Sequence, residues 1–244
     1  MQRTDVRPVH LGSRESLLRM LALIITGLVV AGLGAEVIRF AIPDHEESRG
    51  WRTVVRLLDL NDENSIATWF QGLHLAFVGF LALVWGRGEP RRTRWGWLVL
   101  GAIFFAMSLD ELVSIHEQFT TPLRQLLDID SGPFYYAWVI LGLLLALTVA
   151  LTMTPFLLRL PRATALGLIA AGAVFVAGAV GMEMVGASIA ATPGGMTHLT
   201  YRLAMMTEET LEMIGILLAV RALLVHFTHS RATAPQELAD SQAR

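Results

Sequence analysis

The sequence contains no cysteine and no lysine, and all 19 of its basic residues are arginine. The absence of cysteine excludes disulfides, thiolate metal ligands, cysteine nucleophiles and Cys-ligated iron–sulfur clusters. The absence of lysine excludes a Schiff base, and with it a retinal protein of the usual kind. Charge is also scarce, because only 16% of the residues are charged against about 25% in soluble domains.

The residues that are present are strongly apolar. Hydrophobic residues make up 54% of the 244 positions, in runs long enough for bilayer-spanning helices of about 20 residues. We therefore predict an all-α integral membrane bundle of six transmembrane helices, at about 17–42, 64–86, 95–117, 134–155, 163–190 and 199–223. The expected organisation is a cytoplasmic tail at 1–16, a transmembrane domain at 17–226 and a flexible cytoplasmic tail at 227–244. The first run also resembles a signal peptide, but we expect an uncleaved anchor.

The arginines predict the orientation of the spans. They are concentrated in alternate segments, namely the N-terminal tail, 87–94, 159–162 and the C-terminal tail. Because basic residues are enriched in cytoplasmic loops, both termini are expected to face the cytoplasm. The expected location is the cytoplasmic (inner) membrane of a bacterium, with several passes through it.

One outer segment, 43–63, departs from this arginine pattern. It carries Arg49, Arg52 and Arg56 together with six acidic residues. Apolar residues interleave with the arginines from Trp51 onward, which is typical of an amphipathic helix lying at the membrane surface. We predict such a helix in this segment.

Acidic residues inside the spans are the clearest sign of function. Nine lie within or at the ends of spans, and under the predicted topology all fall in the outer half of the bilayer: Glu36, Glu63, Asp110, Glu111, Glu117, Glu183, Glu208, Glu209 and Glu212. An ionised side chain at mid-bilayer costs at least ~2.5 kcal/mol and usually marks a functional site. Only two arginines are placed to neutralise these negative charges. Arg39 lies three residues from Glu36, and Arg202 lies seven residues from Glu209 on the same side of the sixth span. The cluster is therefore expected to bind a metal ion, hold protons or admit water.

A divalent metal ion is the first of these solutions. The predicted ligands are the carboxylates of Asp110, Glu111, Glu183, Glu208, Glu209 and Glu212. Oxygen ligands with one or two imidazoles suit calcium, manganese, iron or zinc, and the absence of Glu-x-x-His pairs argues against a ferritin-like di-iron bundle. Glu117, His116 and His74 are the candidate general bases for a metal-bound water.

Helical spacing predicts which of these side chains share a face. In the third span it places Asp110, Ser114 and Glu117 on one stripe, with His116 on the flank unless the helix end unwinds. In the second span, His74 lies at the edge of a polar face of the helix.

Three functions fit these features. The first is a metal-dependent membrane enzyme, a hydrolase or oxidoreductase, acting on a lipid-like substrate. The second is a cation or proton transporter, since intramembrane carboxylates are the usual proton relays. The third is an accessory subunit or assembly factor of a larger membrane complex. The expected partners are the lipid bilayer, a lipid-like small molecule or ion, and a membrane-complex partner; no nucleic acid is expected.

Three strings of the sequence carry a resemblance to known families. Residues 62–70, 108–117 (SLDELVSIHE) and 208–215 (EETLEMIG) are similar to a widespread family of uncharacterised bacterial polytopic membrane proteins. Glu63-Asn64, Asp110 and the Glu208-x-x-x-Glu212 pair also resemble, more faintly, the alkaline ceramidase superfamily of membrane metal hydrolases. That superfamily has seven spans and a final histidine pair, where this chain has six predicted spans and carboxylates. Zinc-hydrolase roles are therefore not carried over.

Overall fold

The computed structural model of the chain describes residues 11–41 and 49–242, and all regular secondary structure within them is helical. Six helical segments are long and apolar enough to cross a membrane, which confirms the predicted all-α architecture. They are α1 (Leu11–Ala41), α3 (Ile66–Gly86), α4 (Arg91–Val113), α6 (Trp138–Leu157), α7 (Arg162–Val176) continued by α8 (Glu183–Ala190), and α9 (Leu199–Gln242). Two shorter helices, α2 (Arg49–Leu58) and α5 (Thr120–Leu127), lie between spans.

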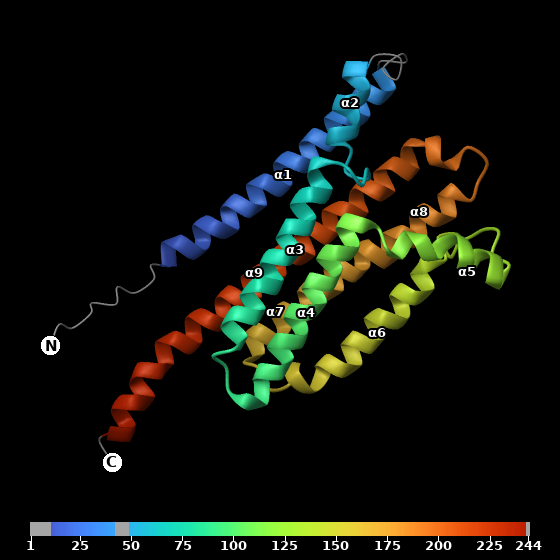
Figure 1. The fold of residues 1–244 in the computed structure, drawn as a ribbon. Coiled ribbons are helices and arrows are strands. Elements are labelled where there is room, and N and C mark those ends of the chain that lie inside the picture. Colours follow the sequence, from blue (N-terminus) through green and yellow to red (C-terminus); the bar gives the residue numbers. More distant parts are fainter. Residues whose placement is uncertain (1–10, 42–48, 243–244) are drawn as a thin grey trace.

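The long helix α9 is central to the bundle (Figure 1). It packs against α1, α3, α7 and α8, while α4 packs on α3 and α6 lies at the periphery. The start of α1 and the end of α9 lie at one end of the molecule, which we call the terminal end. Helix α2 lies at the opposite end, which we call the α2 end. Of the predicted tails, residues 1–10 and 243–244 lie outside the described residues.

An apolar core fills the half of the bundle toward the terminal end. Leu75 and Val78 of α3, Trp97 of α4, and Ile216 and Val220 of α9 are at most 1% exposed. Dispersion contacts of this kind, together with close backbone approach, hold helices together in a bilayer, where lipid is as apolar as leucine. The polar side chains described below therefore lie on the α2 side of an apolar barrier.

Small residues allow the helices of this core to touch. A Cβ added at Gly79 of α3 would lie 3.0 Å from the carbonyl oxygen of Gly101 in α4. A Cβ at Gly215 of α9 would lie 2.8 Å from the backbone nitrogen of Phe175 in α7. Glycine is required at both contacts because any side chain would separate the helices.

The predicted fifth span is interrupted in its middle. A π-helical turn, Ala177–Met182, separates α7 from α8, and Glu183 is the first residue after it. Such turns are rare and occur frequently at functional sites. Helix α9 extends beyond 223, the predicted end of the sixth span, because no glycine or proline interrupts 216–234.

The predicted amphipathic helix at the membrane surface corresponds to α2. Val55 is buried against the bundle, whereas Trp51, Val54 and Leu57 are exposed. The first part of the predicted segment, 42–48, lies outside the described residues.

Candidate functional site

Helix α4 ends four residues earlier than predicted, and this changes the surroundings of Asp110. After Val113 the chain turns at Ser114, whose φ of 51° and ψ of 48° are left-handed. The turn brings His116 back over Asp110: its backbone N–H donates to Oδ1 at 2.9 Å, and its Nδ1 lies 2.8 Å from Oδ2. The predicted stripe from Asp110 to Glu117 is wrong, because Glu117 lies in a separate 3-10 turn (His116–Phe119).

A cavity of about 290 Å³ opens beside this turn, between the α2–α3 loop, α5 and the starts of α6 and α9. Trp138 in its wall donates from Nε1 to Glu183 Oε1 at 2.8 Å. The hydroxyls of Tyr136 and Tyr201 lie 3.0 Å apart in the same wall. The ring of His116 packs on Trp138, with centroids 4.4 Å apart. The cavity therefore leads from the α2 end to Glu183.

Two groups, Glu117 in the cavity wall and His116 beside it, have raised pKa values. Burial raises the pKa of Glu117 to about 7, and the neighbouring Glu63 acts in the same direction. Burial opposes the charged form of His116, but the hydrogen bond and the charge of Asp110 outweigh it, so the pKa of His116 is raised. A carboxyl group with a pKa near neutral pH, such as Glu117, exchanges protons readily with water.

Behind the cavity, carboxyl groups from three helices come together. Glu183 of α8 and Glu208 of α9 lie within hydrogen-bonding distance of each other. Gln71 of α3 donates from Nε2 to Glu212 Oε2 at 2.6 Å, and Glu111 of α4 is within hydrogen-bonding distance of Gln71. Two ionised carboxylates in such contact would repel each other. We call Glu111, Glu183, Glu208, Glu209 and Glu212 the carboxyl cluster.

The π-helical turn determines how closely α7 and α9 approach at this cluster. A Cβ added at Gly178 would lie 2.8 Å from the backbone oxygen of Glu208 and 3.1 Å from Cγ of Glu212. Only glycine fits at this distance. The turn therefore positions Glu183 directly against the two buried glutamates of α9, which are 8% and 7% exposed.

No arginine among the described residues neutralises the carboxyl cluster. Within 11–41 and 49–242, no arginine forms an ion pair with any of its five members. Arg202 was expected beside Glu209, but its Nη2 lies 3.5 Å from Asp59 and its Nε 3.7 Å from Glu36. That prediction is wrong because Arg202 lies at the start of α9, next to the α2–α3 loop. The predicted pair of Arg39 with Glu36 is confirmed, at 3.4 Å.

Several buried polar atoms, at the cluster and on α3 beside it in sequence, have no hydrogen-bond partner among the described residues. They are Oε2 of Glu208, Oε2 of Glu209, Oε1 of Gln71 and both ring nitrogens of His74. His74 is 3% exposed and packs against the ring of Phe70, at 5.2 Å between centroids. Of the three candidate bases, Glu117 lines the cavity, His116 packs on Trp138 in its wall, and His74 does not line it.

The predicted metal ligands are only partly brought together. Five of the six belong to the carboxyl cluster, whereas both carboxylate oxygens of Asp110 are hydrogen-bonded to His116. In the part of the chain that the structure describes, no three histidine or carboxylate groups are arranged to hold a metal ion. A metal site would require these side chains to change their rotamers.

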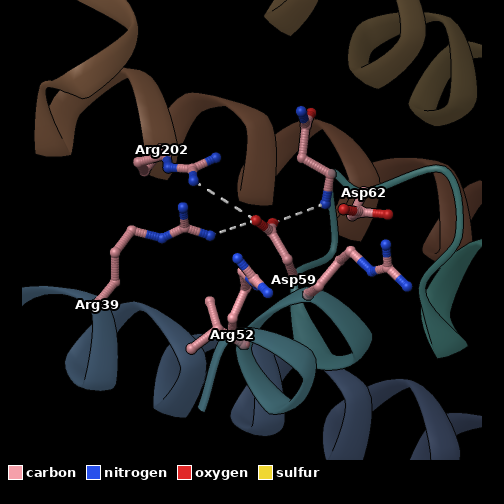
Figure 2. Close-up of a pocket in the computed structure, with 8 residues that line it drawn as sticks. Arg39, Arg52, Asp59, Asp62 and Arg202 are labelled. Atoms are coloured by element: carbon pink, nitrogen blue, oxygen red, sulfur yellow. Dashed lines mark hydrogen bonds and ion pairs between the residues drawn. The ribbon is translucent and has the colours of Figure 1, made fainter. Parts of the chain in front are cut away.

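A second cavity, of about 440 Å³, lies at the α2 end and was not predicted (Figure 2). Four arginines line it: Arg39 of α1, Arg52 and Arg56 of α2, and Arg202 of α9. Asp59 lies between them and accepts a 2.5 Å hydrogen bond from Arg39 Nη2. The unexpected arginine content of 43–63 was the sequence signal for this cavity. The arginines from α1 and α9 could not be assigned to it because they are distant in the sequence.

Comparison with known proteins places the chain in a family without assigning it an activity. No curated protein and no solved structure matches the chain. One family profile matches residues 20–227, which extend from the first span to the last. Its description is "domain of unknown function", which fits the expected resemblance to an uncharacterised family. The match covers well over half of the sequence, so the chain belongs to the family DUF8692.

Proposed function

We propose that the protein is a proton-coupled membrane transporter whose carboxyl cluster takes up and releases protons at the outer face. The contact between Glu183 and Glu208 carries this proposal, since a proton shared between the two carboxyl groups would relieve their repulsion, and the pair lies directly behind a cavity. The arginine distribution supports an inner-membrane protein with the α2 end outside.

A chain of polar groups supports proton movement from the cavity inward. Glu117 lines the cavity and titrates near neutral pH, so it exchanges protons with water. Glu183 lines the same cavity and contacts Glu208, one helical turn from Glu212. Glu212 is in turn hydrogen-bonded to Gln71. Carboxyl groups spaced in this way form proton relays in membrane proteins.

The apolar barrier beyond the cluster bears on how transport would proceed. The core around Val78 and Ile216 separates the cluster from the terminal end, so release there requires the helices to move. The π-helical turn before Glu183 supplies a break at the depth of the site, and discontinuous helices at binding sites are typical of secondary transporters. In this proposal α8 moves relative to α7 when Glu183 and Glu208 lose or gain their shared proton.

Electrical recording on supported membranes tests the proposal without knowledge of the substrate. Reconstituted protein should respond to a pH step on the α2 side with a transient charge displacement, because protons enter part of the membrane field. Glu208→Gln should abolish the displacement, whereas Glu15→Gln, a change at an exposed acid of α1, should leave it intact. A wild-type protein without any displacement would contradict proton uptake at this depth.

A divalent-metal site in a membrane enzyme is the second candidate, and the unpartnered buried oxygens favour it. Oxygen atoms of Glu208, Glu209 and Gln71 have no donor among the described side chains. Carboxylate and amide oxygens are the ligands of calcium, and carboxylates with histidine suit manganese, iron and zinc. In this alternative Glu117 or His116 would act as the base. Elemental analysis of wild-type protein and Glu208→Ala/Glu212→Ala would decide, since a stoichiometric metal lost in the variant supports it.

A further inference from the structure

We propose that the arginine-lined cavity at the α2 end binds a phosphate group, carried either by an anionic phospholipid or by a soluble phosphate ester. The cavity holds about 440 Å³ and contains four guanidinium groups against two carboxylates, Asp59 and Asp62. It is separate from the carboxyl cluster and goes beyond the proposed proton uptake.

Two of the arginines form the base of the site. Arg39 pairs with Asp59 at 2.5 Å and with Glu36 at 3.4 Å. Arg202 pairs with the same two acids, at 3.5 Å and 3.7 Å. Glu36 and Asp59 are 6% and 8% exposed, so this network is fixed and its charges are balanced two against two. It holds α1, α9 and the α2–α3 loop together beneath the cavity (Figure 2).

The other two arginines supply the excess positive charge. Arg52 and Arg56 are one helical turn apart on α2, and both line the cavity. Among the described residues, no carboxylate lies within ion-pair distance of either side chain. Asp62, the remaining acid, accepts the backbone N–H of Asn64 at 2.9 Å. Guanidinium groups with free donors bind phosphate oxygens in bidentate fashion, which makes phosphate the best-matched anion.

The position of the cavity matches the level of phospholipid headgroups. Helix α2 follows the end of α1, at the limit of a membrane span, and α3 begins shortly after it. Trp51 and Leu57 of α2 are 43% and 38% exposed, so the helix presents an apolar surface beside its arginines. A surface helix of this type lies at the boundary between headgroups and acyl chains. A phospholipid phosphate can therefore reach Arg52 and Arg56 from the side.

Native mass spectrometry of the full-length protein in neutral detergent tests the proposal. The probes are phosphatidylglycerol, phosphatidylcholine of the same chain length, and inorganic phosphate as a competitor. Arg52→Gln/Arg56→Gln should weaken phosphatidylglycerol binding by about tenfold or more, because two charge-assisted contacts are lost. Arg49→Gln is the control for the single variant Arg52→Gln, since each removes one positive charge, the first from an exposed position of α2 outside the cavity and the second from inside it. Far-ultraviolet circular dichroism checks that each variant keeps its helices.

Competition with inorganic phosphate shows whether the bound phosphate group belongs to a lipid or to a soluble ester. Phosphatidylglycerol binding that resists inorganic phosphate identifies a lipid site, whereas displacement by inorganic phosphate identifies a site for a soluble phosphate ester; both results support the proposal. Equal binding of the two lipids together with no effect of inorganic phosphate would overturn it. An equal loss in Arg49→Gln and Arg52→Gln would also overturn it, because general surface charge would then explain the binding.

Discussion

Gln71 of α3 donates a 2.6 Å hydrogen bond to Glu212 of α9. This buried polar contact joins two helices through residues that are 141 positions apart in the sequence. Gln71→Leu removes the donor and leaves the Glu212 carboxyl unpaired, which costs roughly 1–3 kcal/mol. We expect its melting temperature in detergent to fall by several degrees. Thr207→Val is the control, since Thr207 is exposed and bonds only within α9. Equal melting temperatures for Gln71→Leu and wild type would show that this contact does not stabilise the bundle.

The pKa of Glu117 predicts a pH dependence of stability. It is raised from 4.5 to about 7 in the folded chain, so the folded state binds this proton more tightly than the unfolded state. The stabilisation is complete below pH 4.5 and is lost as the pH rises toward 7. The raised pKa of His116 acts in the same direction at higher pH. The free energy of unfolding, measured with denaturant across this pH range, should fall less steeply with pH in Glu117→Gln than in the wild type. Parallel pH dependences of the two proteins would refute the assignment.

The glycine contact between α3 and α4 predicts a large effect of one methyl group. A Cβ at Gly79 would lie 2.9 Å from the ring of Phe105 and 3.0 Å from the backbone oxygen of Gly101. Gly79→Ala should therefore destabilise the bundle by about 1–3 kcal/mol, the usual range for overpacking. Gly27→Ala in α1 meets nothing within 4 Å and should be neutral or stabilising. Thermal unfolding of both variants compares them directly, and a neutral Gly79→Ala would mean that the two helices separate easily.

The absence of cysteine makes the orientation simple to measure. Ser131, in the loop before α6, and Arg92, at the start of α4, are both exposed and belong to opposite ends of the bundle. In intact spheroplasts, Ser131→Cys should react with a membrane-impermeant maleimide, and Arg92→Cys should react only after permeabilisation. Each variant carries one cysteine in an otherwise cysteine-free chain, so the labelling is unambiguous. The reverse pattern would invert the predicted topology.

The helices, and the common level of several acids along the bundle, could be predicted because both depend on local sequence. Apolar runs of about 20 residues specify spans, and the rise per residue places Glu183, Glu208 and Glu212 at one level. The pair of Arg39 with Glu36 was predictable for the same reason, since three residues separate them on one helix.

What could not be predicted depends on tertiary contacts and on helix ends. The turn at Ser114 lacks the glycine that usually marks a left-handed helix end, so the return of His116 to Asp110 left no clear signal. Arg202 pairs with Asp59 and Glu36 because the end of α1 and the α2–α3 loop lie next to the start of α9. The arginine-lined cavity likewise requires three helices that are distant in the sequence.

Infrared difference spectroscopy tests the central claim most directly, because protonated carboxyl groups have a carbonyl stretching band that carboxylates lack. Purified wild-type protein at neutral pH should show this band, shifted in deuterated buffer. Glu208→Gln should reduce it, whereas Glu15→Gln should not. No such band in the wild-type protein at neutral pH would mean that the cluster is ionised, and would contradict a shared proton between Glu183 and Glu208.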